Sequence, residues 1–166
     1  MSELTIIEVS GVNLSAVENL ALDIWREHFN PIIGRPQVDY MLEKFQSAAA
    51  IRDQIENQGF LYYLFEDEKE RYIGYCAVVP RPDELFLSKL YFNAENRRRG
   101  FGRRALEFIE SIARDKRLSK ITLTVNKNNT GPINAYKKLG FVITDSLVTD
   151  IGSGFVMDDY KMTKCL

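Results

Sequence analysis

NAENRRRGFGRR, at residues 93–104, is the stretch around which the rest of this sequence is organised. It follows an apolar run with strand character, ELFLSKLYF at residues 84–92, and it opens a segment whose apolar residues recur at helical spacing. A strand, a tight glycine turn and a helix N-terminus together form an anion site. The first N–H groups of a helix lack carbonyl partners, and the helix dipole adds positive potential. The stretch therefore predicts a phosphate site.

Glycines and arginines within this stretch favour a pyrophosphate in particular. Gly100 and Gly102 carry no Cβ, so that a phosphate can approach the main chain closely. Guanidinium groups supply fork-shaped donors around it, from Arg97, Arg98, Arg99, Arg103 and Arg104. The pattern is not the G-x-G-x-x-G fingerprint, because Ala105 occupies the place of the third glycine, and no G-x-x-x-x-G-K-[ST] motif occurs. A Rossmann or P-loop nucleotide site is therefore not expected.

Composition limits the class of protein. At 166 residues, with 45% hydrophobic and 27% charged residues, the chain has the size and make-up of one globular domain, residues 1–166. The net charge of −1 makes the arginine cluster local and disfavours a nucleic-acid partner. Cys76 and Cys165 are too far apart for a disulfide framework or a metal-site spacing, and no signal peptide or membrane span is evident. We expect a cytoplasmic protein without a metal or a membrane partner.

The first third of the sequence predicts one strand and two helices. The strand covers residues 5–9, and the helices cover residues 13–28 and 38–57, the second with a break near residues 48–50. The segment FNPIIGRP, residues 29–36, contains prolines and a glycine and is predicted to be a non-helical, exposed connection.

The middle of the sequence predicts three strands, at residues 60–65, 72–79 and 84–92, followed by a helix that ends near Leu118. The last part predicts a strand at 120–125, a helix at 131–138, and a final strand pair at 141–148 and 155–164, with a linker at 149–154 between the paired strands. The first three of these strands are expected to be consecutive and antiparallel, and the third is expected to be central. The order β-α-α-β-β-β-α-β-α-β-β indicates an α+β fold, a mixed α/β sheet with helices on its faces.

Two motifs in this order resemble those of the GNAT superfamily of acyl-coenzyme-A-dependent N-acetyltransferases. The family's Q/R-x-x-G-x-G/A phosphate motif is matched by Arg97, Gly100 and Gly102. Its later N-x-x-A-x-x-x-Y-x-x-x-G-F pattern is matched by Asn129, Tyr136, Gly140 and Phe141, with Pro132 in place of the alanine. Both motifs lie at the expected separation, and together with the element order they span most of the chain.

The resemblance implies a GNAT-like fold, a mostly antiparallel central sheet that is splayed in the middle, with helices on both faces. It also implies acetyl transfer from acetyl-CoA, as co-substrate, to a primary amine by direct attack in a ternary complex, with no metal. The RRRGFG backbone would hold the pyrophosphate, the strand end at residues 90–92 would pair with the pantetheine arm, and Asn129 would bond the pantetheine amides. The implied coenzyme contacts are Leu90, Tyr91, Phe92, Arg97, Arg98, Arg99, Gly100, Phe101, Gly102, Arg103, Asn129, Asn134 and Tyr136.

Tyr136 and Glu84 are the catalytic candidates. The Tyr136 phenol can donate a proton to the thiolate once the C–S bond begins to break, although packing on Phe141 would also account for this tyrosine. Many relatives carry a glutamate on the strand before the phosphate motif, where this chain has Ser88. Glu84, acting through an ordered water, is the candidate base, and another carboxylate or selection of the neutral amine stays open. His28, at a predicted helix end, is expected to be a dipole partner.

The acceptor is a separate question, because the motifs above concern the donor. FVMDDYKMTKCL, DIWREHF and LYFNAENRRRGFG also resemble segments of bacterial spermidine/spermine N-acetyltransferases. A polyamine would need an acidic groove, for which Asp39, Glu43, Asp158 and Asp159 are candidates. The alternatives are a protein or peptide N-terminal acetyltransferase, a non-catalytic acyl-CoA-binding module, and a nucleic-acid-binding domain that uses the arginines. The C-terminal strands could pair with a second copy in a homodimer.

Overall fold

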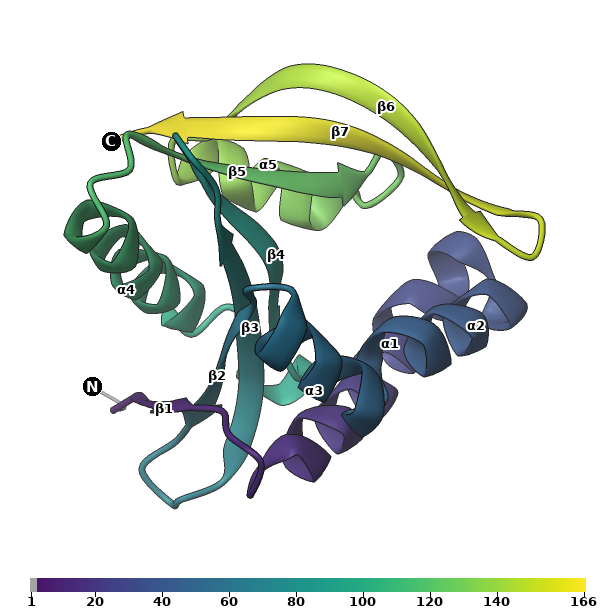
Figure 1. Ribbon diagram of the computed structural model, residues 1–166, viewed down its shortest axis with the longest axis horizontal. Helices are drawn as coiled ribbons and strands as arrows, with labels where there is room; N and C mark the ends of the chain where they lie inside the picture. The colour runs from purple at the N-terminus through teal and green to yellow at the C-terminus, as the bar shows by residue number, and fades with distance from the viewer. Residues whose placement is uncertain (1–2) are drawn as a thin grey trace.

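A seven-stranded sheet in the order β1-β2-β3-β4-β5-β7-β6 forms the centre of the computed structural model, which describes residues 3–166 (Figure 1). The strands are β1 (Thr5–Glu8), β2 (Leu61–Glu66), β3 (Tyr72–Pro80), β4 (Leu85–Phe92), β5 (Lys120–Asn126), β6 (Val142–Gly152) and β7 (Phe155–Cys165). The helices are α1 (Leu14–Ile33), α2 (Arg35–Gln46), α3 (Ala48–Asn57), α4 (Phe101–Asp115) and α5 (Thr130–Lys138), with a 3-10 turn at Ala94–Asn96. Neighbouring strands are antiparallel except for the parallel pair β4 and β5. The expected α+β fold with a central third strand of the β2–β4 run is confirmed.

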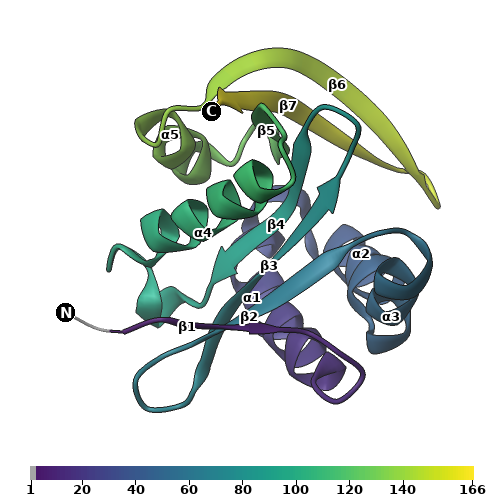
Figure 2. The same cartoon turned by 60° about the vertical axis from the view of Figure 1, so that its left-hand side comes forward.

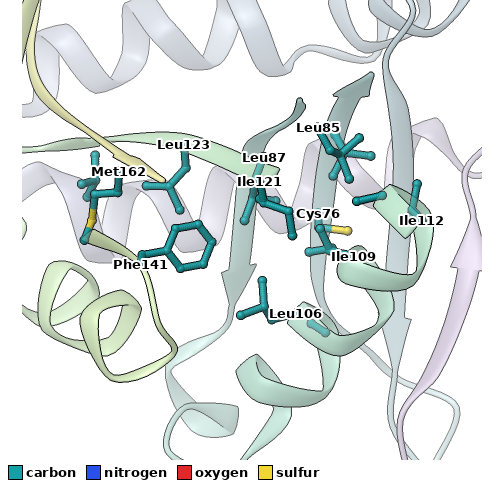
Figure 3. Close-up of a cluster of buried hydrophobic side chains, with 14 of the residues drawn as sticks. Cys76, Leu85, Leu87, Leu106, Ile109, Ile112, Ile121, Leu123, Phe141 and Met162 are labelled. Atoms are coloured by element: carbon teal, nitrogen blue, oxygen red, sulfur yellow. The ribbon is translucent and has the colours of Figure 1, made fainter. Parts of the chain in front are cut away.

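Helices cover both faces of the sheet, as expected, since alternate strand residues point to opposite faces. One apolar core lies under α4 and α5, and in Figure 3 Leu106 and Ile109 of α4 approach Leu87 and Ile121 of the sheet. The other core lies under α1, α2 and α3 and includes Trp25 and Tyr75. Figure 2 shows α4 in front of the sheet and α1 behind it. Each apolar side chain buried in these cores contributes about 1.5–3 kcal/mol.

The sheet splits between β4 and β5. These strands pair only where Leu85–Leu87 lies beside Ile121–Leu123. Ala77 pairs with Lys89 while Val78 pairs with Leu87, so Ser88 is an extra residue, a β-bulge that bends β4. Beyond it the two strands diverge, and Figure 1 shows β2–β4 running steeply while β5–β7 run across them. The main-chain groups of residues 88–91 that face β5 therefore lack a strand partner within the described sheet.

The prediction that residues 29–36 are not helical is wrong. α1 continues to Ile33 with Pro31 inside it, and only Gly34, at φ 86°, separates α1 from α2. Proline removes a single helical N–H donor, while Phe29 and Ile33 pack against the core beneath α1–α3 and hold the extra turn in place. The predicted break near residues 48–50 is confirmed, because Ser47 caps α3 by accepting a hydrogen bond from the Ala50 N–H.

The predicted linker at residues 149–154 is also wrong, because most of it is strand. β6 extends to Gly152, and the hairpin turn consists of Ser153 and Gly154 at φ 54° and 81°. The Ile151 carbonyl accepts hydrogen bonds from the Tyr40 hydroxyl at 2.6 Å and from Lys44 Nζ at 2.7 Å, so α2 anchors this part of the strand. Between residues 3 and 166 no helix is both long and apolar enough to cross a bilayer.

Candidate active site

A cavity of about 530 Å³ opens where β4 and β5 diverge. Its lining extends from Gly102 in the first turn of α4, along residues 86–92 of β4 and 123–126 of β5, to the space beneath α1–α3. Residues of α5 close one side of it and residues of α1 close the other. The two ends of the cavity are therefore connected through the slot in the sheet.

The glycine turn opens directly onto this cavity. Gly100 has the left-handed φ of 81° and precedes α4, whose first N–H groups point away from the helix. A Cβ placed on Gly102 would meet no atom within 4 Å, so that there is open space beside the main chain at this point. The turn keeps the features of the predicted phosphate site.

The arginines of the turn differ in their surroundings. Arg97 donates to both carboxylate oxygens of Glu27 at 3.1 and 2.9 Å and to the Phe92 carbonyl at 3.1 Å. Hydrogen bonding to the Arg97 guanidinium holds the pKa of Glu27 below its ordinary value. Arg99 donates to Asn96 Oδ1 at 2.8 Å, whereas Arg98 and Arg103 are exposed. Arg97 thus connects α1 with the end of β4, in addition to any contact with a ligand.

The end of β4 presents alternate side chains to the two cores. Tyr91 faces α1, with its ring 5.8 Å from Trp25 and 5.9 Å from Phe29. Phe92 faces the opposite way, 5.8 Å from the ring of Phe101. Leu90, Tyr91 and Phe92 all line the cavity, so the predicted strand end lies along the slot.

Tyr136 of α5 lines the same cavity and packs edge-on against Phe141 at 5.4 Å. Both readings of this tyrosine, as a packing residue and as a cavity residue, are therefore compatible with its position. Burial raises the pKa of the Tyr136 phenol, so the hydroxyl keeps its proton at neutral pH.

Asn129 precedes α5 and is buried against the cavity, where His28 Nε2 lies 2.8 Å from its Oδ1. His28 also lines the cavity. It does not lie at a helix end as expected, because α1 continues to Ile33. Asn134, on α5, is exposed and does not line the cavity.

Glu84 lies before the start of β4 and outside the cavity lining. Its carboxylate accepts a hydrogen bond from the Thr122 hydroxyl and lies 3.8 Å from the Arg81 guanidinium. Ser88 does line the cavity, and its hydroxyl accepts a hydrogen bond from Lys89 Nζ at 2.8 Å. The structure therefore does not bring Glu84 together with the other predicted site residues.

Asp159 of β7 is the carboxylate that does line the cavity, and it is only 6% exposed. Burial, together with the negative charge of Asp158, raises the pKa of Asp159 to about 6, while Lys127 opposes the shift. Burial raises the pKa of the nearby Tyr91 phenol, and the negative charge of Asp159 contributes to that shift. In the sequence, Asp159 is only one of four acidic candidates for a polyamine groove. No sequence pattern around it distinguishes Asp159 from its neighbour Asp158.

The acidic residues proposed for a polyamine groove do not converge. Asp39 pairs with Arg26 and Arg35, both at 3.5 Å, and Asp158 pairs with Lys127 at 2.9 Å. The remaining candidate, Glu43 on α2, is exposed. Within residues 3–166, no group of His, Cys, Asp and Glu side chains could hold a metal ion.

The wall of the cavity beneath the helices is held by a chain of buried hydrogen bonds. Trp25 Nε1 donates to the Tyr75 hydroxyl at 3.0 Å, and Tyr75 donates to Gln46 Oε1 at 2.6 Å. Gln46 Nε2 in turn donates to the Tyr62 hydroxyl at 3.1 Å. These hydrogen bonds connect α1 and α2 to β2 and β3, and they hold the two helices in place over the sheet.

Comparison with known proteins identifies similar chains. A family model described as acetyltransferase (GNAT) family matches residues 18–141. Among solved structures, the PaiA N-acetyltransferase from Thermoplasma acidophilum in complex with coenzyme A has a TM-score of 0.83 at 20% identity, over 99% of each chain. Mutant forms of the spermidine/spermine N-acetyltransferase SpeG from Vibrio cholerae have a TM-score of 0.67 at 19% identity, over 98% of this chain and 95% of that one. No curated protein matches by sequence.

Proposed function

The chain belongs to the GNAT acetyltransferase family, and from that premise we propose that it transfers the acetyl group of acetyl-CoA to a primary amine by direct attack in a ternary complex. The observation that carries the proposal is the continuous cavity. One space joins the glycine turn, the slot between β4 and β5, and the region beneath α1–α3. A donor with an anionic end and a long narrow arm fits the first two parts and leaves the third for an acceptor.

The donor substrate would be held mainly by main chain. The first N–H groups of α4 and the open space beside Gly102 suit the pyrophosphate. The unpaired main-chain groups of residues 88–91 suit the amides of the pantetheine arm, and one N–H there would stabilise the oxyanion of the thioester. The side chain of Asn129 would add a polar contact at the far side of the slot.

Two side chains would carry the proton transfers. The amine nitrogen attacks the thioester carbon, and its proton would pass to the Asp159 carboxylate, which is the cavity-lining carboxylate among residues 3–166. Collapse of the tetrahedral intermediate breaks the C–S bond, and the Tyr136 hydroxyl would give its proton to the leaving thiolate. This assignment gives the role of base to Asp159 in place of Glu84, which lies outside the cavity.

A purified sample tests the proposal directly. Incubation with acetyl-CoA and a panel of amines and short peptides should release free thiol and yield acetylated acceptor by mass spectrometry. No thiol release with any acceptor, together with a coenzyme-dependent rise in Tm, would favour the non-catalytic acyl-CoA-binding alternative. Turnover with peptides alone would favour the N-terminal acetyltransferase. Tight, salt-sensitive binding of RNA or DNA without a thermal shift from coenzyme A would favour the nucleic-acid alternative.

A homodimer is part of the proposal. β6 lies at one end of the strand order, and it exposes Val142, Ile143 and Val148. An edge strand with exposed apolar residues can pair with a second copy. Sedimentation equilibrium of the full chain should give about twice the monomer mass, and a single species of 19.1 kDa would contradict the dimer.

A further inference from the structure

Lys89 is a cation on the acceptor side of the cavity. It pairs across the sheet with Ala77, whose side chain belongs to the core beneath α1–α3, so that both side chains lie on that face. Its Nζ lies 2.8 Å from the Ser88 hydroxyl and 5.8 Å from the centre of the Phe60 ring, and the residue lines the cavity. The ammonium group therefore lies in the part of the cavity that is proposed for the acceptor.

The charge of Lys89 is not neutralised by the protein. Across residues 3–166 no carboxylate lies within 4.0 Å of its Nζ, and its polar contact is to a neutral hydroxyl. Burial lowers the pKa of the Lys89 ammonium to about 8, which leaves it mostly charged at pH 7. A half-buried cation without a counter-charge costs stability, and an anion on a bound ligand would offset that cost.

The surroundings of Lys89 limit what the ligand can be. Phe60 lies beside the Lys89 ammonium, and the lining of the same cavity also includes the apolar side chains of Phe29, Met41 and Phe45. Asp159 lines this cavity too, close enough to Tyr91 for its charge to influence that phenol. Lys89 and Tyr91 are two residues apart on one face of β4, so that their Cα atoms are separated by roughly 7 Å along the strand.

We propose that Lys89 binds a carboxylate of the acceptor, which is a zwitterionic amine with an apolar body, its amino group directed to Asp159 and its carboxylate to Lys89. This inference rests on the acetyl transfer proposed above and names the acceptor class for it. A single ammonium matches a monoanion such as a carboxylate better than a phosphate dianion, which would need further donors. A polyamine would place additional positive charge beside Lys89, in a cavity that offers Asp159 as its one carboxylate among the described residues.

Matched acceptor pairs test this inference, each pair differing by one carboxylate: phenylalanine with 2-phenylethylamine, and leucine with 3-methylbutylamine, with spermidine alongside. The full chain should acetylate the carboxylate-bearing member with a kcat/KM at least about tenfold higher than its partner. In Lys89→Met, which keeps the length and apolar part of the side chain, that ratio should fall to about one or below. Lys89→Arg should retain part of the preference, and Lys116→Met, exposed at the far end of α4, should retain all of it.

Calorimetric binding of the acetylated products separates this inference from the proposed transfer, because binding needs no turnover. N-acetylphenylalanine should bind more tightly than N-(2-phenylethyl)acetamide to the unmodified protein, and this difference should vanish in Lys89→Met. If the products bind in this pattern without acetyl transfer to any amine, the transfer fails and the anion site stands. Three outcomes would overturn the inference. The first is a preference of the unmodified protein for 2-phenylethylamine or spermidine, and the second is an unchanged kcat/KM ratio within the acceptor pairs in Lys89→Met. The third is that no carboxylate-bearing compound is bound or turned over.

Discussion

His28 Nε2 lies 2.8 Å from the side-chain oxygen of Asn129, although the two residues are 101 positions apart in the sequence. The contact joins the middle of α1 to the N-terminus of α5 across the cavity. Because an amide oxygen only accepts hydrogen bonds, His28 is the donor in this contact, and the Asn129 amide nitrogen takes no part in it. His28 thereby orients a residue of the proposed donor site.

Loss of the His28 imidazole should therefore weaken donor binding more than the chemical step. In His28→Ala, KM for acetyl-CoA should rise by about three- to tenfold with kcat nearly unchanged, the size of one hydrogen bond. His28→Gln, which can still donate, should recover part of the loss. Steady-state kinetics at saturating acceptor measures both constants, and a fall in kcat alone would mean that His28 acts in catalysis itself.

Removal of the Tyr136 hydroxyl should affect the chemical step. Tyr136→Phe keeps the ring that packs on Phe141 but cannot donate a proton. We expect kcat to fall by about a hundredfold while KM for acetyl-CoA changes by no more than about twofold. Unchanged kcat in this variant would leave Tyr136 with a packing role only. A thermal melt of the variant serves as the control for folding.

The pH dependence should report Asp159. Since its pKa is raised to about 6, the carboxylate is ionised at pH 7 and protonated at lower pH, so kcat/KM should fall as the pH drops below about 6. Asp159→Asn should lower kcat/KM at pH 7 and lack this acidic limb. An acidic limb that persists in the variant would assign the titration to another group.

Stability gives an independent check on the same carboxylate. A pKa raised on folding means that ionisation of Asp159 destabilises the native state as the pH rises from about 4 to about 6. Asp159→Asn should therefore be more stable than the unmodified chain at pH 7, by an order of 1–3 kcal/mol, and this difference should shrink towards pH 4. Denaturant unfolding at both pH values measures it.

Gly102 allows stability and donor binding to be separated. It has an ordinary helical backbone and open space around its missing Cβ, so Gly102→Ala should stabilise the protein by up to about 0.5–1 kcal/mol. The same methyl group would occupy the space proposed for the pyrophosphate, and KM for acetyl-CoA should rise by about tenfold. Glu107→Ala, on the exposed side of α4, is the matched control and should leave KM unchanged. A Gly102→Ala variant with normal KM would contradict the phosphate site.

Glu84 should be dispensable for catalysis. Its carboxylate is engaged by Thr122 and lies outside the cavity, so Glu84→Gln should keep kcat within about threefold of the unmodified value. It should lower the free energy of unfolding by about 1 kcal/mol, because a hydrogen bond to a charged group becomes a neutral one. A loss of kcat of a hundredfold would restore Glu84 as the base.

Much of the fold was predictable because its signals are local. Alternating and helical apolar patterns identified the strands of the sheet and the amphipathic helix that begins at Phe101. The errors fell where local rules conflict with packing. Pro31 suggests a helix end, but α1 continues through it, and Phe29 and Ile33 pack against the core beneath the helices. Residues 149–154 are predicted from the sequence to be a linker, but contacts of Ile151 with α2 hold most of this segment in the strand.

For the site, the sequence by itself determined which residues make up the proposed donor side. Gly100, Gly102, Asn129 and Tyr136 lie in short motifs, because a helix N-terminus and its glycine turn are made by neighbouring residues. The tertiary structure decided the rest. Asp159 differs from Asp158, and Lys89 from other lysines, through its place in a cavity that segments distant in the sequence enclose. The pKa of such a group depends on its burial and on the charges near it. Burial and neighbouring charges depend in turn on which segments the folded chain brings together.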